Sequence, residues 1–178
     1  MLKRYHNAPA HLLLDDTPYF ITGAIYDKRP LLAGPGLKER FTELLYRGFE
    51  RYGWRLDDWV VLDNHYHLLG QSRLGTDLPR LMKYLHGQSA LWLHEANACA
   101  LPVWWNYWDY CPRDEADYRV RQNYLHYNPV RHGYVADLHR YPHSSFPDLL
   151  ERQGREALAA RFRAHPGYRS LVIEEDDF

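Results

Sequence analysis

Two short stretches typical of β-strands, only two residues apart, constrain the fold of this chain most. The first covers about residues 54–62 and ends in the apolar run Trp-Val-Val-Leu, and the second covers about residues 65–71. Aromatic and β-branched residues favour strands, and the Asp63-Asn64 pair between the two stretches is typical of a tight turn. We therefore expect two neighbouring antiparallel strands.

The segments on either side complete a recognisable order. Strand-forming residues also occupy about residues 19–26 and 103–110. Apolar residues at helical spacing predict one helix over about residues 37–52 and a second that begins at Thr76 or Asp77 and continues to about Ala96. The order strand, helix, strand, strand, helix, strand predicts an α+β fold: a ferredoxin-like (RRM-like) antiparallel sheet with helices on one face.

The last third of the chain predicts a helical extension. Asp114 is a candidate N-cap of a third helix, which we expect Pro129 to end. After Gly133 we expect irregular chain through residues 143–145, and a last helix at about residues 154–165. The simplest division is one domain over residues 1–178, with a core at about 18–147 and a C-terminal helix and acidic tail in 148–178.

Charge and composition exclude few functions. The 22 Lys and Arg and 23 Asp and Glu give a net charge of −1. Four of the acids form the run Glu174-Glu175-Asp176-Asp177, so the rest of the chain carries +3. Two cysteines are consistent with a reducing cytoplasm. No signal peptide and no apolar run long enough for a membrane span is visible, so we expect a cytoplasmic protein without a membrane partner.

His65 and His67 are the first candidate functional residues. Side chains two apart on a strand point to the same face, so both imidazoles would lie on one face while Tyr66 points away. Two neutral imidazoles at this spacing can bind a divalent metal, which polarises phosphates. The alternative is two ordinary histidines in a chain that has 11.

The third helix carries a second candidate pair. Tyr124 and Asn128 are four residues apart and would be neighbours on one helix face. The amide oxygen of Asn128 could complete a metal site begun by the two histidines, with Tyr124 one turn away. Asn128 precedes a proline and could therefore lie at the helix end. Spacing alone does not choose between Tyr124 and Tyr127 as the functional tyrosine.

Four motifs together resemble one known family. Asn64-His65-Tyr66-His67 is similar to the HUH motif (His, hydrophobic, His), and residues 124–135 resemble the Y-I-H-x-N-P-V-K-x-G-L-V signature of REP-associated tyrosine transposases. The segments 103–109 and 141–146 resemble the family's W-Q-x-x-Y-W-D/E and W-P-x-S-S-F segments. The match covers about residues 18–147. Asp63 and Trp105 depart from the family's usual proline and glutamine, and the chain is less basic than expected for a DNA enzyme.

The resemblance implies a specific chemistry. It places the nucleophilic tyrosine at Tyr124 and the metal ligands at His65, His67 and Asn128, with Mg²⁺ or Mn²⁺ as cofactor. It implies cleavage and joining of single-stranded DNA at hairpin-forming (REP-like) sequences through a 5′-phosphotyrosine intermediate. It favours a monomer, with a homodimer as the alternative.

Aromatic and basic residues near the tyrosine are candidates for DNA binding. Bases stack on aromatic side chains, and basic residues neutralise phosphates. The candidates are Tyr107, Trp108, Tyr110, Arg119, Arg121, Arg131, Arg161, Arg163 and Arg169. The alternatives are core packing for the aromatic residues, which we expect for Trp104, and a solvated helix face for the arginines.

Two other functions remain open at this point. A ferredoxin-like sheet with exposed aromatic residues can bind single-stranded nucleic acid without cutting it. A phosphodiesterase could use the same metal to activate water. Tyr124 at the matching position favours the transposase, because neither alternative needs a nucleophilic tyrosine.

Overall fold

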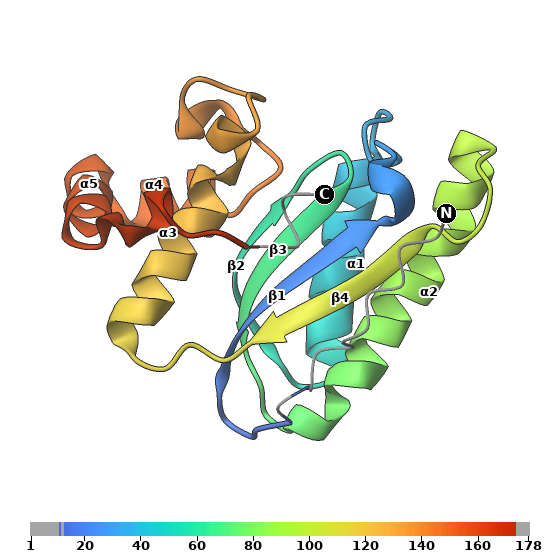
Figure 1. Ribbon diagram of the computed structural model, residues 1–178, viewed down its shortest axis with the longest axis horizontal. Coiled ribbons are helices and arrows are strands. Elements are labelled where there is room, and N and C mark those ends of the chain that lie inside the picture. The colour runs from blue at the N-terminus through green and yellow to red at the C-terminus, as the bar shows by residue number, and fades with distance from the viewer. Residues whose placement is uncertain (1–10, 12, 174–178) are drawn as a thin grey trace.

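A four-stranded antiparallel sheet with the strand order β2-β3-β1-β4 forms the centre of the protein in this computed structural model. The structure describes residues 11 and 13–173. The strands are β1 (Pro18–Ile25), β2 (Arg55–Val61), β3 (His65–Gln71) and β4 (Trp104–Tyr110). The helices are α1 (Leu37–Arg51), α2 (Leu78–Asn97), α3 (Glu115–Arg131), α4 (Phe146–Gln153) and α5 (Arg155–Ala164). The expected ferredoxin-like order is confirmed (Figure 1).

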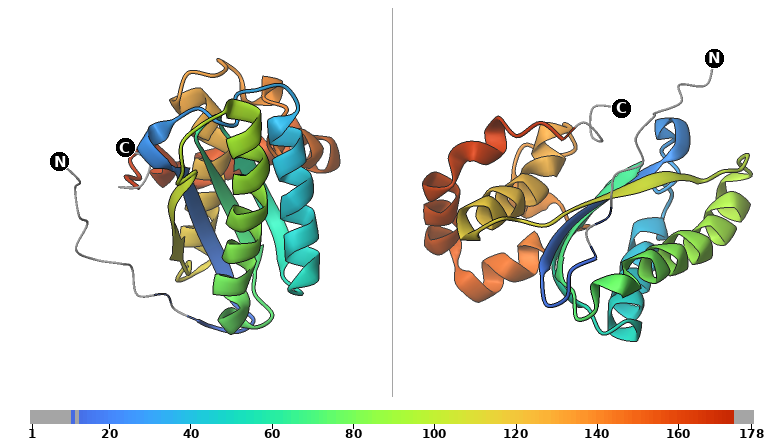
Figure 2. Two further views of the ribbon diagram at one scale, coloured as in Figure 1. Left: turned by 90° about the vertical axis from the view of Figure 1, so that its right-hand side faces the viewer. Right: turned by 60° about the horizontal axis from the view of Figure 1, so that its bottom comes forward.

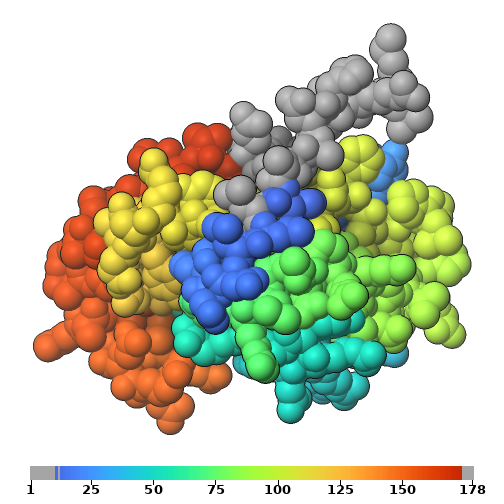
Figure 3. Space-filling model, turned by 90° about the horizontal axis from the view of Figure 1, so that it is seen from below, coloured from blue at the N-terminus to red at the C-terminus, as the bar shows by residue number. Residues whose placement is uncertain are grey.

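The helices form one layer on each face of the sheet. Helices α1 and α2 cover one face, and α3 with α4 and α5 lies on the opposite side (Figure 2). From below, residues near the start of β1 lie between the α3 side and α2 (Figure 3). On that opposite side α3 packs over β2 and β3, and α4 and α5 pack beyond it (Figure 1). Strands β1 and β3 are buried along nearly their whole length, whereas β4 is exposed or half-buried after Trp104.

Each face of the sheet has its own hydrophobic core. Side chains that alternate along a strand point to opposite faces, so neighbouring residues join different cores. Toward α1 and α2 the core includes Ile21, Val61, Tyr66, Leu68 and Trp104, the last as expected. Toward α3 it includes Phe20, Val60, Leu69, Tyr124 and Leu125. The second core fixes α3 on the sheet.

Helix α3 does not end at Pro129, which corrects one expectation. Asp114 caps its start as expected, since its side chain accepts a hydrogen bond from the amide of Asp117. Proline removes one backbone donor, but here it lies in the last turn, and the amide of His132 still bonds to the carbonyl of Asn128 at 3.0 Å. The helix continues to Arg131, and Gly133 follows with a positive φ of 74°.

Helix α4 was not expected. The sequence predicts irregular chain only through residues 143–145 and no element for residues 146–153, which form a helix with Pro147 in its first turn, where proline is tolerated. The expected last helix is confirmed as α5. The acidic run 174–177 lies outside the described residues, as do residues 1–10 and 12. Within the described part, no helix is long and apolar enough to cross a membrane.

Candidate active site

Strand β3 places His65 and His67 on the face of the sheet that α3 covers. Both side chains are buried, with exposed fractions of 5% and 0%. Tyr66 between them points to the other face, where its hydroxyl lies 2.8 Å from Nε2 of His86 on α2. The alternation expected from the sequence is confirmed, and it brings the two imidazoles to ring centroids 5.2 Å apart.

Helix α3 brings Asn128 between the two histidines. Its Oδ1 lies 3.2 Å from Nε2 of His65, and its Nδ2 lies 3.2 Å from Nε2 of His67. The side chain of Asn128 is fully buried. The three side chains that the sequence singled out as metal ligands therefore meet at one point, although they come from two elements.

The outer nitrogens of both rings have partners of their own. Nδ1 of His67 lies 2.9 Å from Oγ1 of Thr22 on β1, and Nδ1 of His65 lies 2.7 Å from Oδ1 of Asn64. An amide oxygen only accepts, so the contact with Asn64 places the proton of His65 on Nδ1. Such partners orient metal-binding histidines, and here they turn Nε2 of both rings toward Asn128.

This arrangement fits a divalent cation. With its proton on Nδ1, His65 presents the lone pair of Nε2 to Oδ1 of Asn128, and two lone pairs 3.2 Å apart repel unless a proton or a cation lies between them. Among the described residues, no group of three or more His, Cys, Asp or Glu side chains is arranged to bind a metal. A site here therefore needs the amide oxygen of Asn128.

Tyr124 lies beside this group, one turn before Asn128 on α3. Its ring meets the ring of His67 edge-on, with centroids 5.6 Å apart. Phe20 on β1 stacks on His67 at 5.3 Å and meets Tyr124 edge-on at 6.3 Å. Tyr124 is only 1% exposed, so a strand of DNA can reach its hydroxyl only when a neighbouring segment moves.

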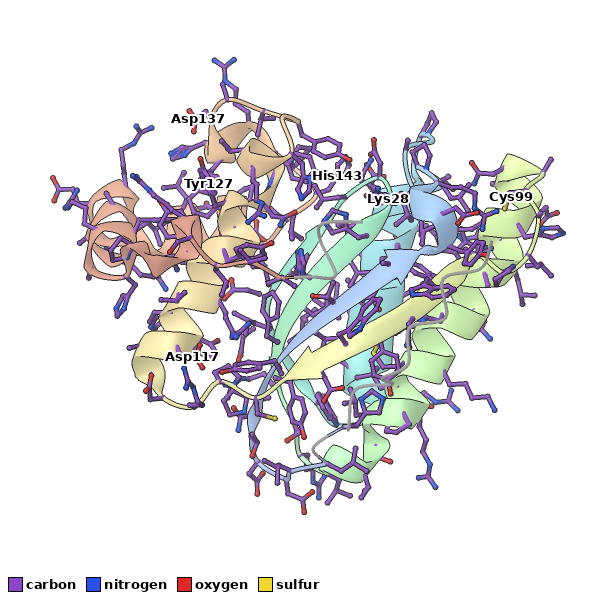
Figure 4. All side chains as sticks on the ribbon, in the orientation of Figure 1. Lys28, Cys99, Asp117, Tyr127, Asp137 and His143 are labelled. Atoms are coloured by element: carbon purple, nitrogen blue, oxygen red, sulfur yellow. The ribbon has the colours of Figure 1, made fainter. Side chains whose placement is uncertain are left out.

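Tyr127 lies on a different side of α3. Its ring packs against Tyr168, with centroids 5.2 Å apart, and Figure 4 marks it on the side of the helix toward the C-terminal segments. The structure therefore distinguishes the two tyrosines that spacing alone could not: Tyr124 faces the two histidines and Tyr127 does not.

The two candidate aromatic residues of β4 point to opposite faces. Trp108 pairs with Thr22 and so lies on the face of the histidines, half-buried. Tyr107 pairs with Gly23 and faces the other way, where its ring stacks on His11 at 4.8 Å. Of the two, Trp108 is on the same face as the candidate site.

The candidate arginines differ in their surroundings. The guanidinium of Arg131 lies 5.3 Å from the centre of the Tyr124 ring, and that of Arg121 lies 3.4 Å from the centre of the Tyr110 ring. Arg119 pairs with Glu115 at 2.6 Å. Arg161 is bound to Asn123 and His126 inside the protein. Arg163 is exposed on α5.

Three residues near the site were not singled out from the sequence. Phe20 and Thr22 alternate along β1, and the register that places them beside His67 is a tertiary feature. His132 follows Asn128 by four residues, and its ring centroid lies 5.0 Å from that of His65. The four-residue spacing was a signal that could have found His132.

Comparisons with known proteins identify the family of this chain. Residues 18–127 match the family model described as "Transposase IS200 like". The chain belongs to the IS200-like transposase family. An Escherichia coli K12 REP-associated tyrosine transposase is 28% identical over 95 residues, which are 52% of this chain and 54% of that protein. A Haemophilus influenzae protein named for the same group is 42% identical over 40 residues, or 22% of this chain and 23% of that protein.

The fold has a solved counterpart. A REP-associated tyrosine transposase bound to a REP hairpin superposes with a TM-score of 0.70 at 21% identity, covering 82% of this chain and 86% of that one. The family resemblance seen in the motifs is confirmed, and so is the fold. The match to the E. coli protein spans only about half of that relative's length.

Proposed function

We propose that this transposase is a metal-dependent endonuclease and strand transferase for single-stranded DNA at hairpin-forming sequences. Tyr124 would form a 5′-phosphotyrosine intermediate. The observation that carries the proposal is the convergence of Tyr124 and Asn128, one turn apart on α3, on the two histidines of β3. The names of the relatives, and the hairpin bound to the solved one, support REP-like repeats as the substrate class.

The proposed reaction exchanges one phosphate ester for another. The phenolic oxygen of Tyr124 attacks phosphorus, an oxygen–phosphorus bond to tyrosine forms, and the bond from phosphorus to the 3′-oxygen breaks. The phenol loses a proton and the leaving 3′-oxygen gains one. A 3′-hydroxyl can then attack the phosphotyrosine and rejoin the DNA, because no ester bond has been lost to water.

His65, His67 and Asn128 would hold the metal, Mg²⁺ or Mn²⁺, with the two nitrogen ligands favouring Mn²⁺. When bound, the ion polarises the non-bridging oxygens of the phosphate. The other side chains orient the reactants. Thr22 holds the ring of His67, and Phe20 stacks on that ring and meets Tyr124 edge-on.

Arg131 can stabilise the negative charge of the proposed nucleophile, Tyr124. A free tyrosine has a pKa of about 10, so its phenolate needs a positive charge nearby at neutral pH. The guanidinium of Arg131 lies over the ring of Tyr124 and can supply that charge. We propose Arg131 and Trp108 as DNA contacts on the site face and Arg163 as an exposed contact on α5.

The other candidates have weaker support as DNA contacts. Arg119, Arg121 and Arg161 are engaged within the protein, and Tyr107 faces away from the site. We propose a monomer that acts in the cytoplasm, where the DNA of the bacterial relatives lies. Sedimentation of the protein with and without hairpin DNA tests the monomer.

A covalent-adduct assay tests the function. Purified protein is mixed with hairpin DNA from the flanks of its own gene in Mn²⁺, and the products are separated on a denaturing gel. A label at the 3′ end follows the fragment that stays attached to tyrosine. We expect a labelled band at the size of the protein that disappears with chelator and in Tyr124→Phe. Tyr127→Phe is the matched control and keeps the band.

The other outcomes separate the alternatives. Cleavage without an adduct points to hydrolysis by a phosphodiesterase. Hairpin binding without cleavage in Mg²⁺ or Mn²⁺ points to a nucleic-acid-binding module. An adduct that persists in Tyr124→Phe overturns the assignment of the nucleophile.

A further inference from the structure

A second stripe of polar side chains on α3 lies across the helix from Tyr124 and Asn128. Tyr118, Gln122 and His126 follow one another at intervals of four residues and donate to two consecutive carboxylates on β2. The hydroxyl of Tyr118 lies 3.3 Å from Asp57 Oδ2, and Nε2 of Gln122 lies 2.7 Å from Asp58 Oδ2. Nε2 of His126 lies 3.1 Å from Asp58 Oδ1.

The two stripes are on opposite sides of one helix. Successive helical residues turn by about 100°, so a residue two positions away lies about 200° around the axis. Gln122 and His126 are each two positions from Tyr124, and Leu125 lies between the stripes against the sheet. Helix α3 is therefore held on one side by β2 and faces the histidines of β3 with the other.

A bulge in β2 directs Asp58 toward α3. Leu56 pairs with Gly70, but Asp58 pairs with the next residue of β3, Leu69, so Asp57 is the extra residue. A bulge of this kind changes the face to which the following side chain points. Asp58 consequently joins Val60 on the α3 side, whereas regular alternation from Leu56 would point it toward α1.

The buried carboxylate of Asp58 is satisfied by three donors. It is 2% exposed, and the hydroxyl of Ser145 adds a hydrogen bond at 3.0 Å to those from Gln122 and His126. Burial alone would raise the pKa of Asp58. The interactions with His126, Gln122 and Ser145 outweigh burial and hold the pKa below its usual range.

Arg161 fixes the orientation of the His126 ring. Its Nη2 lies 3.0 Å from Nδ1 of His126, and a guanidinium only donates. The ring proton is therefore on Nε2, which faces Asp58. The carboxylate of Asp58 is thus linked through the imidazole of His126 to the guanidinium of Arg161 on α5. A fully hydrogen-bonded buried network of this kind holds its side chains in one favourable geometry.

We propose that Asp58 is a positioning residue for the strand-transfer reaction. By holding Gln122 and His126 it sets the rotation of α3 about its own axis, and so the place of Tyr124 and Asn128 opposite the two histidines. A rotation of about 10° moves a group about 6 Å from the axis by about 1 Å. A displacement of that size can slow a reaction by about a hundredfold. This role rests on the proposed function.

The test separates the rate of reaction from binding. In the full chain, Asp58→Asn keeps the size of the side chain and removes its charge. We expect single-turnover adduct formation to slow by about ten- to hundredfold, while the Kd for hairpin DNA changes by less than threefold. Gln122→Met removes one donor at similar length and gives a smaller loss of rate with unchanged Kd. It also keeps the test decisive where Asp58→Asn does not fold.

Leu45→Ala is the matched control for lost stability. Leu45 is fully buried in α1, in the layer on the other face of the sheet. We expect it to lower the melting temperature and keep the adduct rate at a temperature where all variants are folded. A purely structural role of Asp58 predicts the opposite pattern, in which the rate follows stability in all three variants.

Three results would overturn the proposal. Asp58→Asn and Gln122→Met could both react at the wild-type rate, which would exclude a positioning role. Leu45→Ala could be as slow as Asp58→Asn at equal stability, which would show a structural effect. A wild-type protein that forms no adduct overturns the proposed function and this role with it, and the inactive wild type distinguishes that failure from the other two.

Discussion

The amide nitrogen of Asn128 lies 3.2 Å from Nε2 of His67, although 61 positions separate the two residues in the chain. This contact joins the middle of the sheet to the helix that carries Tyr124. It exists because β3 points His67 toward the face that α3 covers, and because α3 continues through Pro129.

Removal of the Asn128 amide is expected to weaken metal binding. Asn128→Ala leaves the two imidazoles without their oxygen partner, so we expect the Kd for Mn²⁺ to rise by at least about tenfold. The loss of the free-Mn²⁺ signal in electron paramagnetic resonance measures it. His94→Ala, on α2, is the control and should bind as the wild type does. Equal affinity in Asn128→Ala would exclude the amide as a ligand.

Thr22 is expected to affect metal affinity although it is not itself one of the proposed metal ligands. Its hydroxyl lies 2.9 Å from Nδ1 of His67, and partners of this kind typically change metal affinity by about 10- to 100-fold. Thr22→Val keeps the shape and loses the hydrogen bond. We expect weaker Mn²⁺ binding, and Thr22→Ser, which keeps the hydroxyl, should restore most of it. A Thr22→Ser variant as weak as Thr22→Val would show that the hydroxyl is not responsible.

Arg131 is expected to contribute to DNA affinity through its charge. Its guanidinium lies over the Tyr124 ring and donates to the carbonyl of Leu171 at 3.1 Å, whereas that of Arg119 is paired with the carboxylate of Glu115. Arg131→Gln should weaken hairpin binding and reduce the slope of log affinity against log salt by about 0.7, the value for one contact to a single strand. Arg119→Gln should leave both nearly unchanged. Fluorescence anisotropy at several salt concentrations measures the slopes, and equal slopes for Arg131→Gln and wild type would remove Arg131 from the interface.

Gly23 is expected to be required for packing beneath Tyr66. A Cβ at this position would lie 2.3 Å from Cζ of Tyr66, whose buried ring is held by the hydrogen bond to His86. Gly23→Ala should therefore lower the free energy of unfolding by about 1–3 kcal/mol. Gly87→Ala, at an exposed position of α2 with open space around it, should raise it by about 0.5–1 kcal/mol. Urea unfolding compares them, and an unchanged Gly23→Ala would contradict the close approach.

His86 is expected to make stability depend on pH. Burial lowers the pKa of His86 from 6.5 to about 3. Between these two pKa values the unfolded chain binds a proton that the folded protein does not. The free energy of unfolding therefore decreases as pH falls below about 6.5, by up to about 1.4 kcal/mol per pH unit. The contribution is fully present above that pH.

Urea unfolding between pH 7 and 5, above most carboxylate titrations, measures this slope. His86→Gln should reduce it and leave the contribution of His143, whose pKa burial also lowers, whereas His94→Gln in the same helix should keep the wild-type slope. A wild-type slope that survives in His86→Gln would assign the pH dependence to another group.

Local sequence patterns were sufficient for most elements and for the identity of the candidate residues. Alternation along 65–71 placed both histidines on one face, and four-residue spacing joined Tyr124 to Asn128, because strand and helix periods are properties of the backbone itself. The motifs indicated the family. The predicted end of α3 at Pro129 was wrong, because the rule that proline ends a helix does not hold where the proline lies in the last helical turn.

The tertiary structure decided what lies around those residues. Sequence spacing could not place Asn128 between the histidines, direct Tyr127 away from them, or bring Thr22 to His67. It could not show that a bulge turns Asp58 onto α3 either. These features depend on strand register and on the rotation of a packed helix. Both are set by contacts between residues far apart in the chain, which no local period contains.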